Sequence, residues 1–171
     1  MRRSAHKSRQ RGQTLVEYIL LFGGVIVPLT FGLIAMAQLM WVWHSVVDYT
    51  RLGARYAATH CWQGDGQNVV AWMRQNAPPI PDQATFRDGG VDLVVEYFKL
   101  NPDTRTLEAF SCDGECSAAC IPDTVTVRVR NYEFRPFMAY LNLPPVQIPD
   151  FSATMPIESA GCDPDTGTCT P

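Results

Sequence analysis

Thirty consecutive residues, from Tyr18 to Val47, contain no Asp, Glu, Lys or Arg, and this uncharged stretch constrains the fold more than any other feature. About 20 apolar residues are enough to cross the hydrocarbon core of a bilayer as a helix. The stretch therefore predicts a transmembrane span over about residues 18–44. Trp41, Trp43 and His44 close the span in the way that interfacial aromatic residues do.

Charge is distributed unevenly on the two sides of this stretch. Residues 1–12 form a basic leader without an acid, and its charged residues are Arg2, Arg3, Lys7, Arg9 and Arg11. Residues 59–171 carry seven Arg or Lys against fifteen Asp or Glu, a net charge of −8. The positive-inside rule predicts a single-pass protein of the inner (cytoplasmic) membrane, with the leader in the cytoplasm and the acidic part outside. Because topology accounts for the basic leader, we expect no nucleic-acid partner.

Glu17 is the only carboxylate among the first 47 residues, and it directly precedes the predicted transmembrane span. An acid at the bilayer centre costs about 2.5–3.5 kcal/mol on insertion scales, so its presence indicates a partner or a purpose. A Glu at headgroup level near the start of a helix is also favoured by the helix dipole, so its position does not by itself prove that it has a partner.

Helical spacing continues beyond the span, and we expect residues 13–60 to form one N-terminal helix. Residues 13–58 would extend about 69 Å at 1.5 Å per residue. Small or branched side chains recur at i, i+3, i+4 spacing and predict close packing of another element: Val46, Thr50, Gly53, Ala54 and Ala57. A bulkier stripe lies beside them: Val42, Tyr49, Leu52 and Tyr56. Pro28, with Gly23 and Gly24 one turn earlier, predicts a kink or a short melted stretch, although such residues are also simply common in membrane helices.

Residues 61–171 predict a small extracytoplasmic α+β domain with a Cys-rich tail. Asp65 is placed to cap a short helix that three prolines end, and this helix carries Val69, Val70, Trp72 and Met73. Alternating apolar residues predict strands over 91–98, 107–110, 125–130 and 151–157. The connections are too short for crossover helices, so the strands should pair mainly antiparallel. The predicted fold class is α+β: a long N-terminal transmembrane and amphipathic helix, then a small antiparallel sheet domain with disulfides.

All six cysteines follow the span: Cys61, Cys112, Cys116, Cys120, Cys162 and Cys169. An even number on an oxidising side of the membrane predicts disulfides. Six cysteines allow fifteen pairings, and the tight loop between Cys162 and Cys169 favours that pair. The spacing Cys112-x3-Cys116-x3-Cys120 leaves a metal or iron–sulfur site as an alternative. It lacks a CxxC element and a nearby His, so we expect no metal and no other cofactor.

A catalytic motif is not apparent, and we expect neither an enzyme nor a small-molecule substrate. His6, His44 and His60 are not spaced with a Ser, Cys or carboxylate as in a known motif. His60 precedes Cys61, but neighbours in a helix or strand usually point apart. Residues 163–167, Asp-Pro-Asp-Thr-Gly, lack the remaining ligand positions of a calcium loop and predict a turn.

Two segments resemble pilin-like proteins. Gly12-Gln13-Thr14-Leu15-Val16-Glu17-Tyr18 resembles the processing site of type IV prepilins, and its Glu-Tyr pair is similar to the Flp pilins of the tight-adherence (Tad, type IVb-like) pilus system. Residues 50–58, Thr-Arg-Leu-Gly-Ala-Arg-Tyr-Ala-Ala, resemble the end of the first helix in TadE-like minor pilins, also called pseudopilins. A weaker similarity to that family's closing strands covers Val125-Thr126-Val127, Phe134-Arg135-Pro136, Ala153-Thr154-Met155 and Glu158.

This resemblance implies that a prepilin peptidase cuts between Gly12 and Gln13 on the cytoplasmic face. Gln13 would become the new amino terminus, and Glu17 would pair with the terminal amine of a neighbouring subunit. An unpaired acid and an unpaired amine are each costly in a low dielectric, so their pairing would select the register of assembly. Gly12 suits the cut because it permits an extended backbone in a narrow cleft. The implied partners are membrane lipid, the peptidase, other Tad/Flp pilins and the pilus assembly machinery.

The chain departs from the family in two features. Pro28 comes later than the proline usually found soon after the glutamate, and six cysteines in a 113-residue outer part exceed the bulk of a major Flp pilin. Both favour a minor subunit, either built into a cell-surface pilus or kept in the membrane as an assembly factor. Two other classes remain open: a secreted disulfide protein whose signal peptide is cut after Ala37, and an uncleaved single-span protein with an outer binding domain.

Overall fold

The computed structural model describes residues 6–134, 144–163 and 165–170, with side chains from Thr14 onward. Arg2, Arg3, Arg135 and Pro136, named above, lie outside the described residues. The chain divides into two compact units, Met1–Trp41 and Val42–Pro171, and the two are described separately.

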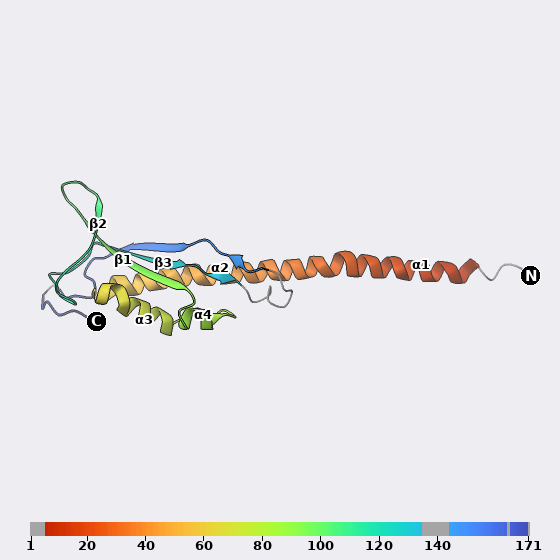
Figure 1. The fold of residues 1–171 in the computed structure, drawn as a ribbon, viewed down its shortest axis with the longest axis horizontal. Coiled ribbons are helices and arrows are strands. Elements are labelled where there is room, and N and C mark those ends of the chain that lie inside the picture. The colour runs from red at the N-terminus through yellow and green to blue at the C-terminus, as the bar shows by residue number, and fades with distance from the viewer. Residues whose placement is uncertain (1–5, 135–143, 164, 171) are drawn as a thin grey trace, which may run out of the picture. The chain divides into compact units, whose positions relative to one another are not determined.

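The first unit is helical throughout its described part. It consists of α1 (His6–Leu21), a π-helical turn η1 (Phe22–Ile26) and the beginning of α2 (Val27–Thr59), coloured red to orange in Figure 1. The helix begins at His6, inside the basic leader, rather than at residue 13 as expected. Helical backbone therefore covers all of residues 13–58.

The π-helical turn replaces the kink or melted stretch expected around Gly23, Gly24 and Pro28. Pro28 has no N–H, so the Gly24 carbonyl loses its usual donor four residues later. In the turn, the Val27 N–H bonds to the Phe22 carbonyl instead, and the chain stays helical. The Thr30 hydroxyl adds a bond of 2.8 Å to the Ile26 carbonyl. The predicted disturbance thus takes the form of a wide turn, a known response of helices to such residues.

A four-stranded antiparallel sheet forms one layer of the second unit. Its strand order is β2-β1-β3-β6, with β1 (Asp92–Leu100), β2 (Leu107–Ala109), β3 (Thr124–Arg130) and β6 (Phe151–Pro156). These strands agree with the four predicted ones to within two residues at each end. A second sheet pairs β4 (Glu133–Phe134) with β5 (Val146–Gln147). The α+β class, with a long N-terminal apolar helix and a small antiparallel sheet, is confirmed.

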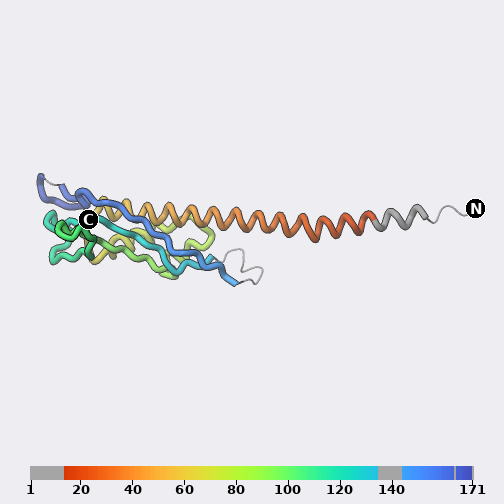
Figure 2. The backbone as a smooth tube through the Cα atoms, turned by 90° about the horizontal axis from the view of Figure 1, so that it is seen from above, coloured from red at the N-terminus to blue at the C-terminus, as the bar shows by residue number. Residues whose placement is uncertain are grey.

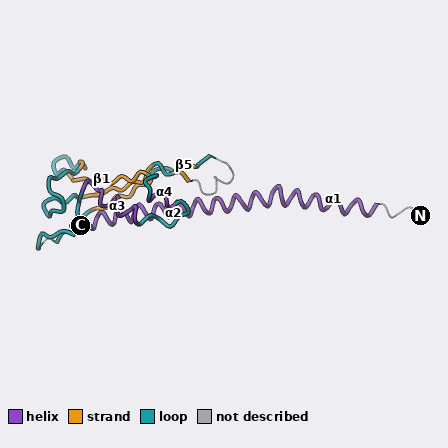
Figure 3. Tube along the Cα trace, turned by 60° about the horizontal axis from the view of Figure 1, so that its bottom comes forward, coloured by secondary structure: helices purple, strands orange, loops and turns teal. Residues whose placement is uncertain are grey.

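Helices form the other layer of this unit (Figure 3). They are the part of α2 after Val42, α3 (Gln67–Gln75) and α4 (Gln83–Arg87), with a 3₁₀ turn η2 (Gly64–Gly66) before α3. The expected cap by Asp65 is wrong. Asp65 has φ 49° and Gly66, the residue before α3, has φ 86°, so the chain enters the helix through two left-handed residues. No side chain caps α3 as a result.

The core lies between the two layers. The apolar positions of β3 point into it and are almost completely buried: Val125, Val127 and Val129. From α2 it receives Val42, Val46, Tyr49, Thr50, Gly53, Ala54 and Ala57. β6 runs beside this part of α2 in Figures 1 and 2, and Trp43 packs edge-on against Phe151 at 4.8 Å.

Gly53 shows why the side chains of the predicted small-residue stripe have to be small. A Cβ at this position would lie 2.5 Å from Sδ and 2.7 Å from Cε of Met73, a side chain of α3 that is itself fully buried. The missing side chain lets α2 and α3 approach closely. Leu52, expected in the neighbouring bulky stripe, is 47% exposed and stands outside the core.

Candidate functional site

The four residues of the predicted processing and pairing site all lie on α1. Gly12 and Gln13 have helical backbone. Glu17 and Tyr18 are exposed, and the Tyr18 ring stacks on Phe22 with centroids 6.0 Å apart. Gln13 and Glu17 are four residues apart, so they share one side of the helix, about 6 Å apart along its axis.

Gly12 has helical backbone in the free chain, whereas the extended backbone expected above concerns the chain bound in the cleft of a peptidase. A protease that cuts between Gly12 and Gln13 must first open the helix there, because proteases bind extended chains. Glycine reduces this cost, since it is about 1 kcal/mol less favourable than alanine inside a helix. We therefore expect cleavage at this bond to require local unwinding of α1 at Gly12.

Glu17 is surrounded by exposed apolar side chains. Leu15, Val16, Ile19 and Leu20 are each more than half exposed. Glu17 itself has no hydrogen-bond or ion-pair partner among the side chains described from Thr14 onward. Apolar surface of this extent normally contacts lipid or another protein, and Glu17 lies within it.

One helix of the described residues, Thr14–Thr59, is long and apolar enough to cross a membrane by length and composition. None of its most apolar 18-residue stretch is buried. Val42, two residues before the predicted end of the span, is fully buried in the second unit. Trp41 and Trp43, on either side of it, remain 49% and 36% exposed.

The six cysteines form three disulfides, Cys61–Cys116, Cys112–Cys120 and Cys162–Cys169. The last is the pair expected from the tight loop. The first two join the cysteines considered as an alternative metal site, so their thiolates are not available as ligands. Cys61 is also bonded, which removes the possibility that His60 activates a neighbouring thiol. The His60 ring stacks on Tyr56 instead, with centroids 3.7 Å apart.

The disulfides gather loops around the end of α2. The Cys116 N–H donates to the Trp62 carbonyl at 3.1 Å, and the Cys61 N–H donates to the Thr170 carbonyl at 3.0 Å. Gly161, with φ 67°, lies so close to the Thr59 carbonyl that a Cβ there would overlap it. Three segments distant in sequence thus close over one helix end.

The Asp163 loop is a turn, as expected. The Asp163 carboxylate accepts the Asp165 N–H at 2.9 Å, and the Gly167 N–H reaches the Asp163 carbonyl at 2.8 Å. The backbone donor of Asp165 lowers the pKa of the Asp163 carboxyl. Among the described residues there is no group of three or more His, Cys, Asp or Glu that could hold a metal ion.

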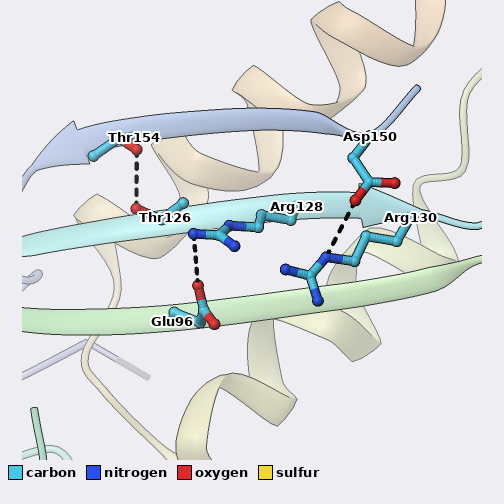
Figure 4. A network of polar contacts seen from close by, with 6 residues as sticks. All are labelled: Glu96, Thr126, Arg128, Arg130, Asp150 and Thr154. Atoms are coloured by element: carbon cyan, nitrogen blue, oxygen red, sulfur yellow. Dashed lines mark hydrogen bonds and ion pairs between the residues drawn. The ribbon is translucent and has the colours of Figure 1, made fainter. Parts of the chain in front are cut away.

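The sheet face that points away from the helices is polar (Figure 4). Arg128 pairs with Glu96 at 3.2 Å, and the Thr126 and Thr154 hydroxyls are 2.9 Å apart. Arg130 pairs with Asp150 at 3.5 Å near the start of β6. Each ion pair is partly exposed and contributes only about 0–1 kcal/mol.

A second polar contact is internal and was not predicted. Tyr132 is 2% exposed, and its hydroxyl donates to both carboxylate oxygens of Asp82 at 2.9 Å. Desolvation raises the pKa of Asp82, while the bond from Tyr132 opposes that rise. Burial also raises the pKa of Tyr132. No sequence pattern links these residues, which are 50 positions apart.

Comparison with protein-family models, with curated proteins and with solved structures found no significant match to this chain. Functional inference therefore depends on the residues and geometry described above.

Proposed function

We propose that the protein is a TadE-like minor pilin, or pseudopilin, of a Tad/Flp-type pilus, non-enzymatic and inserted in the inner membrane by its N-terminal helix. The observation that carries the proposal is the placement of Glu17. It is the only acid among residues 1–47, it lies on an exposed apolar part of the helix, and it is the fifth residue after the Gly12–Gln13 bond of a prepilin-like motif.

Removal of residues 1–12 would create a positive amine at Gln13 beside this acid. On a regular helix the amine of the same chain is only about one turn from Glu17. In a membrane both groups need compensation, and the pairing of an amine from one subunit with the acid of the next would satisfy both charges. The proposed role is assembly: each subunit enters at the register where the charges meet.

The outer unit suits a minor rather than a main filament subunit. Its sheet, helices and three disulfides make a stable body for contacts outside the membrane. The proposed partners are lipid, prepilin peptidase, other Tad/Flp pilins and the assembly machinery, and the proposed orientation has the leader in the cytoplasm.

The amino-terminal sequence of the chain purified from its host's membranes tests this proposal. We expect it to begin at Gln13. A start at Gln38 would instead mean a signal peptide cut after Ala37 and a secreted protein, and a start at Met1 would mean an uncleaved anchor.

A Gly12→Leu variant adds a second test of processing. A bulky side chain at the residue before the cut should block cleavage and leave the leader on the chain, which the intact mass will report. Gly12→Ala is the matched control and should be cleaved at least partly, because it adds only a methyl group. Equal cleavage of the leucine variant and the wild type would remove the processing site from the proposal.

A further inference from the structure

A cavity of about 220 Å³ lies between β1, the turn η2 and the chain at the end of β2. Sites for drug-sized ligands have about 300–1,000 Å³, so this cavity suits a small molecule or a single chemical group. Four of its eight lining residues are aromatic: Trp62, Tyr97, Phe98 and Phe110. The aromatic content of this wall indicates the chemistry of a ligand.

The aromatic rings form a corner rather than a flat wall. Trp62 and Phe110 have ring centroids 5.6 Å apart and planes at 89° to each other. Trp62 and Tyr97 are each only 6% exposed, so packing holds them in position. A compact, rounded group can touch two perpendicular rings at once, whereas a planar group stacks on one ring only. Because the faces of aromatic rings carry partial negative charge, this corner favours a rounded cation.

Asp65 adds a negative charge at the mouth of the cavity. It is exposed, and its carboxylate has no hydrogen-bond or ion-pair partner among the residues that the structure describes. The other lining acid, Glu96, is already paired with Arg128 at 3.2 Å (Figure 4). None of the eight lining residues is a Lys or an Arg. The cavity therefore combines aromatic faces with one uncompensated negative charge, and both attract a cation.

The walls of the cavity are held in place by contacts outside it. Gly66, with φ 86°, brings η2 against β1, and a Cβ at this position would lie 2.8 Å from the Cβ of Val95. The Gly64 N–H donates to the Glu115 carboxylate at 2.9 Å, which fixes the other end of the turn. Trp62 directly follows a disulfide-bonded cysteine. Because these walls are ordered before a ligand arrives, binding loses little conformational entropy.

Phe110 already attracts one cation of the chain itself. The Lys99 ammonium lies 5.9 Å from the centroid of the Phe110 ring, within the range of cation–π attraction. This ammonium donates to the Ile121 carbonyl at 3.4 Å, and Lys99 borders a neighbouring cavity rather than the one walled by Trp62. Lys99 therefore does not take the place of a ligand beside Trp62 and Asp65.

We propose that this cavity is an aromatic cage that binds a small quaternary ammonium cation, with its methyl groups between Trp62 and Phe110 and with Asp65 at the mouth. Aromatic cages recognise such cations through cation–π attraction. A primary ammonium needs hydrogen-bond acceptors for its N–H groups, and a guanidinium is planar, whereas a quaternary ammonium is rounded and has no N–H to satisfy. This binding site goes beyond the proposed function and does not depend on it.

A quaternary ammonium group also occurs in phosphocholine headgroups, where a phosphate lies beside it. Asp65 would face that phosphate, and no lining residue is basic, so the phosphate would have no compensating charge. The cavity should therefore prefer a free quaternary amine, such as choline, to the headgroup of a lipid.

Choline and 3,3-dimethylbutan-1-ol provide the sharpest test, because they have the same shape and differ in charge. Each is titrated into the full chain in a maltoside detergent, and calorimetry reports the Kd. We expect choline to bind about tenfold or more tightly than the neutral alcohol, and more tightly than glycerophosphocholine. Equal binding of choline and the alcohol, or no binding of choline, would overturn the inference. Tighter binding of glycerophosphocholine would keep the cage but assign it to lipid headgroups.

Two variants locate the site. Asp65→Asn removes the charge but tolerates the same left-handed backbone, and it should weaken choline binding about fivefold. Phe110→Leu keeps an apolar side chain but removes the ring, and it should weaken binding about tenfold. Asp88→Asn, at an exposed acid that does not line the cavity, is the matched control and should bind choline as the wild type does. Unchanged choline binding by Asp65→Asn and Phe110→Leu, with wild-type near-UV circular dichroism, would refute the assignment to this cavity.

Discussion

Removal of the Cys61–Cys116 disulfide should destabilise the outer unit more than removal of Cys162–Cys169. The first bridge spans 55 residues and the second spans 7. In the chain-entropy description, loops of these lengths correspond to about 4 and about 2.5 kcal/mol of stabilisation through the unfolded state. Cys61 is 1% exposed and Cys162 is 6% exposed. Burial therefore gives no reason to expect a larger loss of stability from removal of Cys162–Cys169.

The comparison uses Cys61→Ala with Cys116→Ala, and Cys162→Ala with Cys169→Ala as the matched control. Urea unfolding of the full chain in detergent, followed by near-UV circular dichroism, reports the free energy of unfolding of each double variant. With a slope of about 2 kcal/mol per molar urea, the first variant should lose about 2 M in midpoint and the second about 1.2 M. Equal losses, or a larger loss for the control, would refute the loop-length reasoning.

Three further outcomes follow from single contacts. Gly53→Ala should cost about 1–3 kcal/mol of unfolding free energy because its Cβ overlaps Met73, and adding Met73→Ala should make the two costs non-additive in a denaturation double-mutant cycle. Tyr132→Phe should cost about 1–3 kcal/mol near pH 7. The pKa of Asp82 in the folded state is raised above 3.8, so unfolding free energy is lost as pH rises through that folded pKa. The phenylalanine variant lacks the bond that opposes this rise, so it should lose unfolding free energy more steeply with pH. Unfolding curves of the variant with no greater pH dependence than those of the wild type would contradict this. Glu17→Gln should leave cleavage largely intact but impair pilus assembly, and normal piliation by electron microscopy would exclude the charge-pairing role.

The main strands were predictable because their faces differ in polarity. Val125, Val127 and Val129 alternate with Thr and Arg, and β3 begins within one residue of the predicted position. The long helix was also predictable from a pattern, since an uncharged stretch of that length is compatible with few structures other than a helix. In each case the pattern extends over enough residues to outweigh local exceptions.

Short elements and distant pairings were not predictable. α4 has five residues, and β4 and β5 have two each, which is too few to show a period. Asp65 looked like a cap from residue type alone, but the left-handed turn at Gly66 decides how α3 begins. The Cys61–Cys116 pairing depends on how the sheet brings two distant loops together. The prepilin-like segment shows the opposite case: its sequence is distinctive, while the helical state of Gly12 appears only in the structure.

The π-helical turn at Phe22–Ile26 sets the angular phase between the two stretches of helix on either side of it. Each residue advances an α-helix by about 100°, so deletion of one residue within the turn would restore regular α-helix and rotate Glu17 by about that angle relative to the residues after Val27. Substitutions that keep the π-helical backbone would preserve this phase, whereas deletions and insertions would not. The number of residues in this segment is therefore critical for the charge pairing proposed for Glu17.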